Sequence, residues 1–169
     1  MSTHAYSRCW LHLIWGTFKR EGMFNPKTAA KMSGFLTDYA KKNGIYMKIN
    51  YVNTDHVHAL IDLATNMTIE QVVKLLKGTS SHWINEQDLL VGKFAWGRGY
   101  GAFSVSQSGV NEVCAYIAGQ AEHHRIKSFT EEYERFVKVY GLEWRDEETV
   151  ETVSSQSARP TPLVKTRGQ

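Results

Sequence analysis

The order in which strand-like and helix-like patterns follow one another restricts the fold of this chain more than any other feature of its sequence. Residues 5–18 (AYSRCWLHLIWGTF) alternate between two sets of mostly apolar side chains and are rich in aromatic residues, which is typical of a covered β-strand. Residues 45–52 and 56–63 are predicted to be two more strands, and the short polar segment between them indicates a hairpin. Residues 102–106 (AFSVS) are predicted to be a fourth, short strand.

Four other segments carry the signals of helices. Residues 26–44 follow an asparagine, start with a proline and end in Asn-Gly, which are typical limits of a helix. The sequence Thr-Ile-Glu-Gln at residues 68–71 is typical of a capping box, and it precedes a helical pattern that runs to about residue 87. Beyond a glycine-rich stretch and the fourth strand, helices are predicted over residues 110–127 and residues 130–141.

Together these patterns give the order strand, helix, strand, strand, helix, strand, followed by further helices. That order is the split βαβ unit of a ferredoxin-like fold. We therefore predict an α+β domain with a ferredoxin-like (RRM-like) antiparallel sheet, helices on one face of the sheet, and additional C-terminal helices. Residues 1–146 are expected to form this domain, whereas residues 147–169 are polar, contain proline and serine, and are expected to be a disordered tail. The fold alone predicts no function.

Composition and charge exclude some classes of protein. Hydrophobic residues make up 42% and charged residues 22% of the chain, which is an ordinary globular composition. The net charge of +3 is compatible with a nucleic-acid partner but does not require one. We see neither an N-terminal leader pattern nor a run approaching the ~18 apolar residues of a membrane helix, so we predict a cytoplasmic protein with no membrane partner. Cys9 and Cys114 lie in apolar-patterned segments and are expected to be buried, reduced thiols.

Two histidines interrupt the apolar pattern of the strand predicted over residues 56–63. Successive side chains of a strand point to opposite faces, so His56 and His58 share one face. The other face is apolar and is expected to pack on the main core; it carries Val57, Ala59, Ile61 and Leu63. Two imidazoles in this arrangement can bind one metal ion. A pair of structural or surface histidines explains the same pattern, so a third ligand is needed before the pair indicates a metal site.

A second set of candidate functional residues lies on the helix predicted over residues 110–127. Four polar residues follow one another at spacings of four, four and three and therefore share one face of that helix: Glu112, Tyr116, Gln120 and His123. This face is either the polar side of an amphipathic helix or a binding face. Gly119 favours the close approach of a ligand or another backbone, because a glycine within a helix costs about 1 kcal/mol relative to alanine. The end of the helix is expected to be solvated; it consists of His123, His124 and Arg125.

Several of these segments resemble those of a known protein family. TDHVHALIDL (residues 54–63) resembles the histidine–hydrophobic–histidine (HUH) strand of single-strand nucleases. YIAGQAEHHR (residues 116–125) resembles the tyrosine helix of the single-tyrosine HUH transposases, the insertion-sequence-200-like family. GYGAFSVSQS (residues 99–108) resembles a further segment of the same family. The resemblance extends from about residue 6 to about residue 144, and the ordered set of segments is far more specific than any one of them.

The resemblance implies a role for each candidate residue. His56, His58 and Gln120 would bind a divalent metal ion, Mg²⁺ or Mn²⁺, and Tyr116 would be the nucleophile. The expected protein is a transposase that nicks and rejoins single-stranded DNA at hairpin-bearing transposon ends through a 5′-phosphotyrosine. It is expected to be a homodimer, and in some members the tyrosine helix serves the partner subunit's histidines. The segment AGQAEHH stands where the branch acting on palindromic repeats has Asn-Pro, which favours the insertion-sequence branch.

These residue types suit the implied chemistry. Imidazole and amide ligands are neutral, so they leave the full charge of the ion to offset that of a phosphodiester, although the softness of imidazole suits zinc better than magnesium. Asp55 is either an accessory ligand or a turn residue, and the turn is favoured. Three other functions remain open: a related domesticated endonuclease acting on palindromic repeats, a non-catalytic ferredoxin-like nucleic-acid-binding module with bases stacked on its sheet, and a metal-dependent hydrolase of small phosphoesters.

Overall fold

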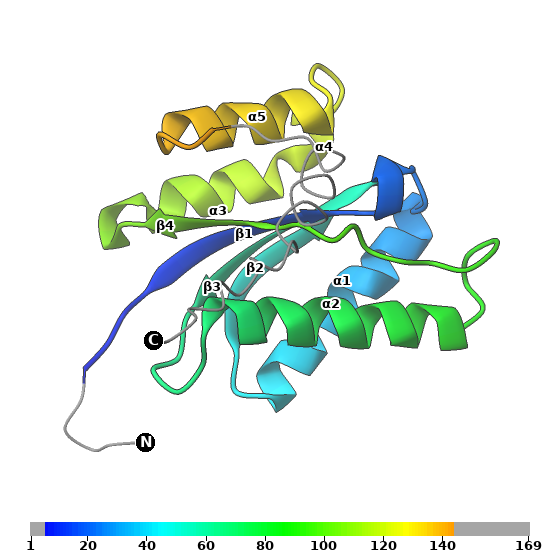
Figure 1. Cartoon of the computed structure of the whole chain (residues 1–169), viewed down its shortest axis with the longest axis horizontal. Coiled ribbons are helices and arrows are strands. Elements are labelled where there is room, and N and C mark those ends of the chain that lie inside the picture. Colours follow the sequence, from blue (N-terminus) through cyan, green and yellow to red (C-terminus); the bar gives the residue numbers. More distant parts are fainter. Residues whose placement is uncertain (1–5, 144–169) are drawn as a thin grey trace, which may run out of the picture.

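The computed structural model describes residues 6–143, and its centre is a four-stranded antiparallel sheet (Figure 1). The strands are β1 (Trp10–Gly16), β2 (Tyr46–Val52), β3 (His56–Asp62) and β4 (Gly101–Val105). Their order across the sheet is β2-β3-β1-β4, and every neighbouring pair is antiparallel. This arrangement is that of a ferredoxin-like sheet, so the predicted α+β fold is confirmed.

Two long helices cover one face of the sheet. They are α1 (Pro26–Lys42) and α2 (Ile69–Glu86), and each begins at a complete capping box, the second of which is the one predicted at residues 68–71. Their apolar sides and the sheet enclose the main core, which includes Leu13, Trp15, Met32, Leu36, Val57, Ala59, Ile61 and Leu76. Removal of these side chains from water is the main favourable contribution to folding.

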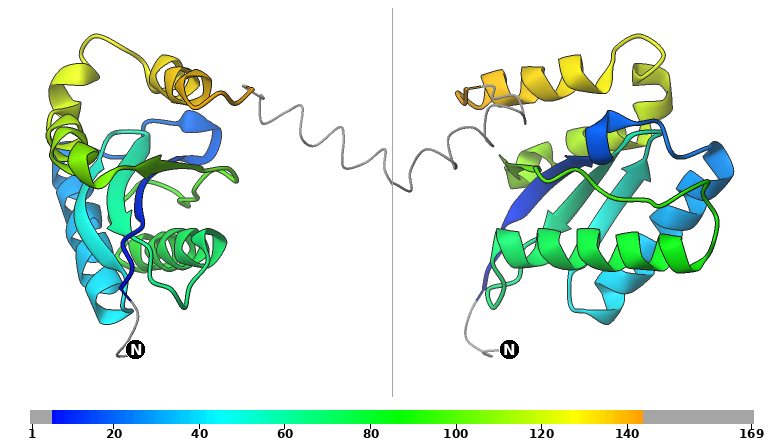
Figure 2. Two further views of the ribbon diagram at one scale, coloured as in Figure 1. Left: turned by 90° about the vertical axis from the view of Figure 1, so that its left-hand side faces the viewer. Right: turned by 45° about the vertical axis from the view of Figure 1, so that its right-hand side comes forward.

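The C-terminal helices cover the opposite face, so that in the right-hand view of Figure 2 the sheet lies between α2 below and α5 above. They are α3 (Val110–Ala118), α4 (Gln120–His123) and α5 (Phe129–Val139). Two short 3₁₀ turns, η1 (Phe18–Arg20) and η2 (Gln107–Gly109), follow β1 and β4. The sheet is therefore the middle layer of three.

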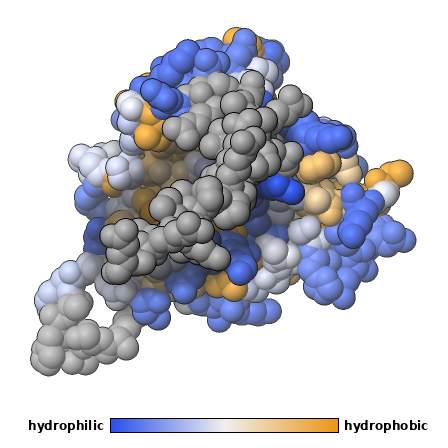
Figure 3. Space-filling model, in the orientation of Figure 1, coloured by the Kyte–Doolittle hydropathy of each residue, from blue (hydrophilic) through white to orange (hydrophobic). Residues whose placement is uncertain are grey.

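One side of α5 holds it against the sheet. Phe129 and Val137 of α5 are buried together with Ile14 of β1 and Phe103 of β4, whereas the part of α5 visible in Figure 3 is mostly hydrophilic. Gly16 at the end of β1 permits the close approach, because a Cβ atom there would lie 2.9 Å from the Phe129 ring. The position of α5 thus depends on packing between segments from opposite ends of the described chain.

The side chains of β3 divide between the two faces as predicted. Val57, Ala59 and Ile61 belong to the main core, and His56 and His58 point to the opposite face. This second face is also covered, because the C-terminal helices pack on it, and both histidines are 0% exposed. The histidine pair is therefore not a surface pair.

The structure corrects two predictions, one about the length of a helix and one about the burial of a cysteine. The helix predicted over residues 110–127 ends at Ala118, because Gly119 is a poor helix former, and α4 begins as a separate turn after it. Cys9 was expected to be buried but is exposed, because it precedes β1 and the part of the sheet that the helices cover. Cys114 is half-buried, and both thiols are free.

The predictions about the ends of the domain and about cellular location are not tested by these residues. The tail predicted over residues 147–169 lies outside the described residues, as does the end of the domain predicted over residues 1–146. Within residues 6–143, no helix combines the length and the apolar character needed to cross a membrane. The cytoplasmic location stays a prediction.

Candidate metal and nucleophile site

The two histidines of β3 direct their Nε2 atoms toward one space above the sheet. Nδ1 of His56 lies 2.6 Å from Oδ1 of Asp55, and Nδ1 of His58 lies 2.9 Å from Nε2 of His12 on β1. With Nδ1 engaged, Nε2 of His58 is left without a partner and can bind a metal, whereas Nε2 of His56 lies 3.0 Å from the side-chain amide nitrogen of Asn53, which a metal would displace. A carboxylate at Nδ1 also makes the His56 imidazole a better ligand. Asp55 lies in the turn before β3, as predicted, and its side chain orients His56.

A carboxylate and a third imidazole from the C-terminal segment reach the same space. Oε2 of Glu132 lies 2.9 Å from Nε2 of His124. The same oxygen lies 3.6 Å from Nε2 of His58 and 3.7 Å from Nε2 of His56. Ligand atoms of all four side chains lie within 4.8 Å of one another. The expectation that His124 belongs to a solvated helix end is therefore wrong, because the chain breaks at Gly119 and turns this histidine toward Glu132.

No pattern in the sequence singled out Glu132. It is one of two glutamates in the first turn of α5, where acidic side chains are common because of the helix dipole. A weak signal was present nonetheless. Glu132 lies three residues after Phe129 and four before Phe136, so it occupies the apolar side of the helix, where a carboxylate is out of place.

Gln120 is fully buried and belongs to the same hydrogen-bonded group. Its Oε1 lies 2.8 Å from Nε2 of His124 and accepts a longer hydrogen bond, 3.4 Å, from Asn53 in the turn before β3. Its Nε2 donates to Oε1 of Glu132 at 3.1 Å. Gln120 therefore contacts His124, Glu132 and Asn53, and its role as a metal ligand stays a prediction.

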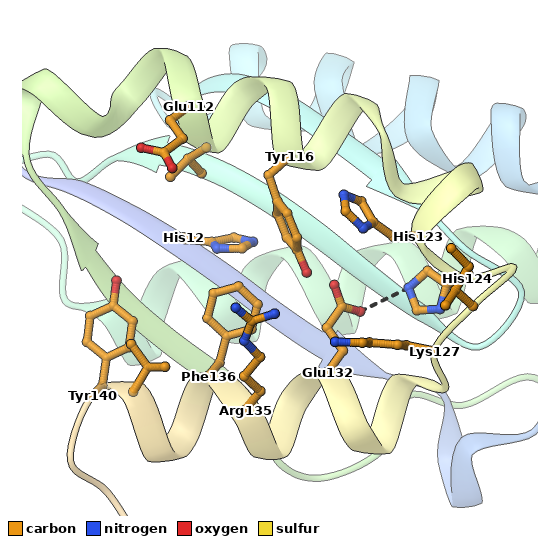
Figure 4. Close-up of a pocket in the computed structure, with 13 residues that line it drawn as sticks. His12, Glu112, Tyr116, His123, His124, Lys127, Glu132, Arg135, Phe136 and Tyr140 are labelled. Atoms are coloured by element: carbon orange, nitrogen blue, oxygen red, sulfur yellow. Dashed lines mark ion pairs between the residues drawn. The ribbon is translucent and has the colours of Figure 1, made fainter.

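Tyr116 approaches this group from α3. Its half-buried ring lies 5.8 Å from the ring of His58 and 5.1 Å from that of His123, measured between centroids. Figure 4 shows the ring directed from α3 across a cavity toward α5. This cavity has a volume of about 560 Å³, and His124 and Glu132 line it together with Tyr116. The predicted nucleophile and part of the ligand group therefore open onto one space within a single chain.

Burial controls the charge of the group. It raises the pKa of Glu132 to about 7 and lowers the pKa of His12 to about 3. Burial, together with the neighbouring His56, lowers the pKa of His124 to about 4 and that of His58 well below its ordinary value of 6.5. Without a cation, these three histidines are therefore neutral at pH 7, and Glu132 is close to half protonated.

The donor set fits a divalent cation. Nε2 of His58 and Oε2 of Glu132 are buried and have no hydrogen bond of acceptable geometry, although the latter lies close to His124. Each such atom costs about 1–3 kcal/mol when it is left unsatisfied, and a cation that binds the free lone pairs removes this cost. The carboxylate also adds a hard oxygen ligand, which suits Mg²⁺ or Mn²⁺ better than imidazoles alone.

Replacement of Glu132 with glutamine is expected to change how the stability of the metal-free protein depends on pH. Folding favours the neutral carboxyl, because its pKa rises from 4.5 to about 7. The stability that this carboxyl contributes is fully present below pH 4.5 and is lost as the pH rises through about 7, by about 3 kcal/mol in total. Urea unfolding in EDTA at pH 5 and pH 8 should show this loss in the wild-type protein but not in Glu132→Gln.

The matched control for this measurement is Glu70→Gln, which changes an exposed glutamate in the first turn of α2. It should keep the wild-type pH dependence. Saturating Mn²⁺ should remove the loss at pH 8 in the wild-type protein, because metal binding favours the ionised carboxylate. If Glu132→Gln and the wild type depend on pH in the same way, Glu132 does not carry a raised pKa.

A ferredoxin-like sheet with a His-x-His strand beneath a helix that carries tyrosine, followed by glutamine, has the features of the HUH class of transposases. Comparison with known families agrees with this class. The family model described as "Transposase IS200 like" matches residues 5–120, which is more than half of the chain. The chain belongs to this family, as its sequence segments indicated, and its general activity is that of a DNA-cleaving and strand-transferring enzyme.

Individual relatives are also transposases. The ISDra2 transposase TnpA of Deinococcus radiodurans is 29% identical over 114 residues, which cover 64% of this chain and 81% of that protein. A solved structure of a Deinococcus radiodurans protein assigned as a transposase is 25% identical, with a TM-score of 0.57, and the match covers 71% of this chain and 96% of that one. A REP-associated tyrosine transposase bound to a REP hairpin has a TM-score of 0.54 over 73% of this chain and 74% of its own. At 11% identity, this last structure shows the fold alone.

Proposed function

We propose that this transposase nicks and rejoins single-stranded DNA at hairpin-bearing transposon ends, with Tyr116 as its nucleophile and a divalent metal ion as its cofactor. The observation that carries the proposal is the shared cavity. Tyr116 lines it from α3, and His124 and Glu132 line it beside the two histidines of β3. The REP hairpin bound to one of the structural relatives supports a substrate of this kind.

The proposed ligands of Mg²⁺ or Mn²⁺ are the side chains that meet in the buried group: His56, His58, Gln120, His124 and Glu132. When bound, the ion supplies positive charge that offsets the negative charge of a phosphodiester. Burial lowers the pKa values of His58 and His124, so both imidazoles are neutral at pH 7 and have lone pairs available for the ion. Asp55 and His12 orient the two β3 imidazoles through Nδ1.

Tyr116 would attack the scissile phosphorus through its phenolic oxygen. A bond forms between phosphorus and this oxygen as the bond to the 3′-oxygen of the preceding nucleotide breaks. The phenolic proton passes to a neighbouring base or to water, and the departing 3′-oxygen takes up a proton. The 5′-phosphotyrosine retains the energy of the phosphodiester, so a second 3′-hydroxyl can reverse the step and join a new strand without ATP.

The other functions that the sequence left open fit the fold less well or use the same chemistry. A module that stacks bases on its sheet needs an exposed sheet face, but helices cover both faces of the described sheet. A hydrolase of small phosphoesters has no need of a tyrosine beside the ligand group. A related endonuclease acting on palindromic repeats would use the same residues and would differ in its DNA target.

Formation of a covalent protein–DNA adduct tests the proposal. Labelled single strands, each with a hairpin, are copied from the DNA that flanks the gene and from a random-sequence library. They are incubated with the protein and Mn²⁺ or Mg²⁺ and then denatured. We expect a denaturation-resistant band that EDTA abolishes. Binding with no adduct on any strand would favour the binding module, and turnover of a small phosphoester alone would favour the hydrolase.

We propose that each site is assembled within one chain of the expected homodimer, because Tyr116 and His58 of the same chain lie in ring contact. A mixture of Tyr116→Phe and His58→Ala proteins, refolded together, should therefore form no adduct. If the tyrosine served the partner subunit, mixed dimers would contain one intact site and would recover activity. Light scattering of the wild-type protein provides the control and should give twice the mass of the chain.

A further inference from the structure

The cavity between α3 and α5 extends along α5 beyond Tyr116, His124 and Glu132. Figure 4 shows Phe136 and Tyr140 along α5 on the side away from His124. We propose that this part of the cavity binds one unstacked nucleotide of the DNA strand, next to the phosphate that Tyr116 attacks. The inference rests on the proposed function. It concerns α5, which lies beyond the residues 5–120 matched by the family model.

Aromatic side chains form the walls of this part of the cavity. The ring of Phe136 lies 5.7 Å from that of Tyr116 and 5.2 Å from that of His12, measured between centroids. The hydroxyl of Tyr140 donates to the backbone oxygen of Ser104 on β4 at 2.9 Å, which fixes the position of its ring. Phe136 is half-buried and Tyr140 is 41% exposed, so both rings still present surface to a ligand. Bases of any identity stack on such rings.

Charge and size also suit a nucleotide. Lys127 and Arg135 line the cavity and are exposed, and Figure 4 shows Arg135 beside Phe136, whereas the exposed carboxylate of Glu112 lines the opposite wall from α3. Cations next to an aromatic wall can hold the phosphates on either side of a stacked base. The whole cavity, including the part beside His124 and Glu132, has a volume of about 560 Å³, within the range of roughly 300–1,000 Å³ that small-ligand sites occupy. An aromatic wall flanked by cations, beside the nucleophile, therefore fits a nucleotide better than it fits an uncharged apolar ligand.

Photo-crosslinking tests the nucleotide site without requiring cleavage. Hairpin DNA carrying 5-iododeoxyuridine at one single-stranded position at a time is bound to the wild-type protein in EDTA and irradiated. Mass spectrometry then identifies the crosslinked peptide. We expect crosslinks to Phe136 or Tyr140 from one position of the strand. Crosslinks confined to other parts of the protein would overturn the inference, whether or not an adduct forms when metal is added.

Kinetics on a strand that forms the adduct provide the second test. Removal of the base at the crosslinked position should slow adduct formation by the wild-type protein about 5- to 100-fold. Phe136→Leu should slow the reaction of the intact strand to a similar extent and should be insensitive to loss of the base, whereas Phe136→Tyr should behave as the wild type does. An equal effect of base removal on the wild type and on Phe136→Leu would show that the base does not stack on Phe136.

The control variant is Lys138→Gln, which changes an exposed residue of the same helix that pairs with Glu134 and is not part of the cavity lining. It should leave the rate unchanged with both strands. Failure of the wild-type protein to form an adduct with any strand would contradict the proposed function instead. In that case the crosslinking result still decides whether the cavity binds a nucleotide.

Discussion

Replacement of Tyr116 with phenylalanine is expected to lower the rate of covalent adduct formation by about a thousandfold or more, because the variant has no oxygen to attack the phosphate. The substitution removes one oxygen atom and keeps the ring, so the contacts with His12, His58 and Phe136 persist. Binding of the uncleaved strand and the thermal stability of the protein should therefore change little. The measurement is the yield of denaturation-resistant adduct over time with single-stranded hairpin DNA and Mn²⁺.

The matched control is Tyr46→Phe, which removes the hydroxyl of an exposed tyrosine on β2. It should form the adduct at the wild-type rate. Mass spectrometry of the digested adduct should locate the nucleotide on Tyr116. If Tyr116→Phe still forms the adduct, another residue is the nucleophile and the chemical part of the proposed function is wrong.

Replacement of His58 with alanine is expected to abolish stabilisation of the protein by metal. A ligand that binds the folded state alone raises the free energy of unfolding by about 2.7 kcal/mol when its concentration is 100 times its dissociation constant. The imidazole of His58 lies 3.6 Å from Glu132 through an Nε2 atom that has no hydrogen bond, so its removal takes away a central ligand. Unfolding in urea with EDTA or with Mn²⁺ should show a metal-dependent difference in the wild type and none in His58→Ala.

His82→Ala is the control for this experiment, because His82 is an exposed histidine on α2 that pairs with Glu86. It should keep the full response to Mn²⁺. Circular dichroism in EDTA establishes whether His58→Ala folds; if it does not, isothermal titration of Glu132→Gln with Mn²⁺ tests the same group and should show weakened binding. Undiminished stabilisation of His58→Ala by Mn²⁺ would place the metal elsewhere.

Local patterns in the sequence were sufficient for the architecture and identified four of the six candidate site residues, all but His124 and Glu132. Strand parity follows from the geometry of a single strand, so it placed His56 and His58 on one face without knowledge of their neighbours. The spacing of Tyr116 and Gln120 predicted one face of a single helix, but α3 ends at Ala118 and Gln120 begins the separate α4, so only the tertiary structure places these two side chains relative to each other. The resemblance to HUH transposases then connected the two segments. These inferences needed neither a contact nor a distance.

The remaining residues of the site depended on the tertiary structure. His124 looked like a solvated helix end until the break at Gly119 turned it toward the sheet. Glu132 looked like an ordinary first-turn carboxylate until α5 packed across β1 and β4 and brought it to 3.6 Å from His58. The sequence by itself thus determined the order of the elements and the face that each side chain takes, because both are local properties. Only the packing of α5 decided which side chains meet, because that depends on contacts between segments far apart in the chain.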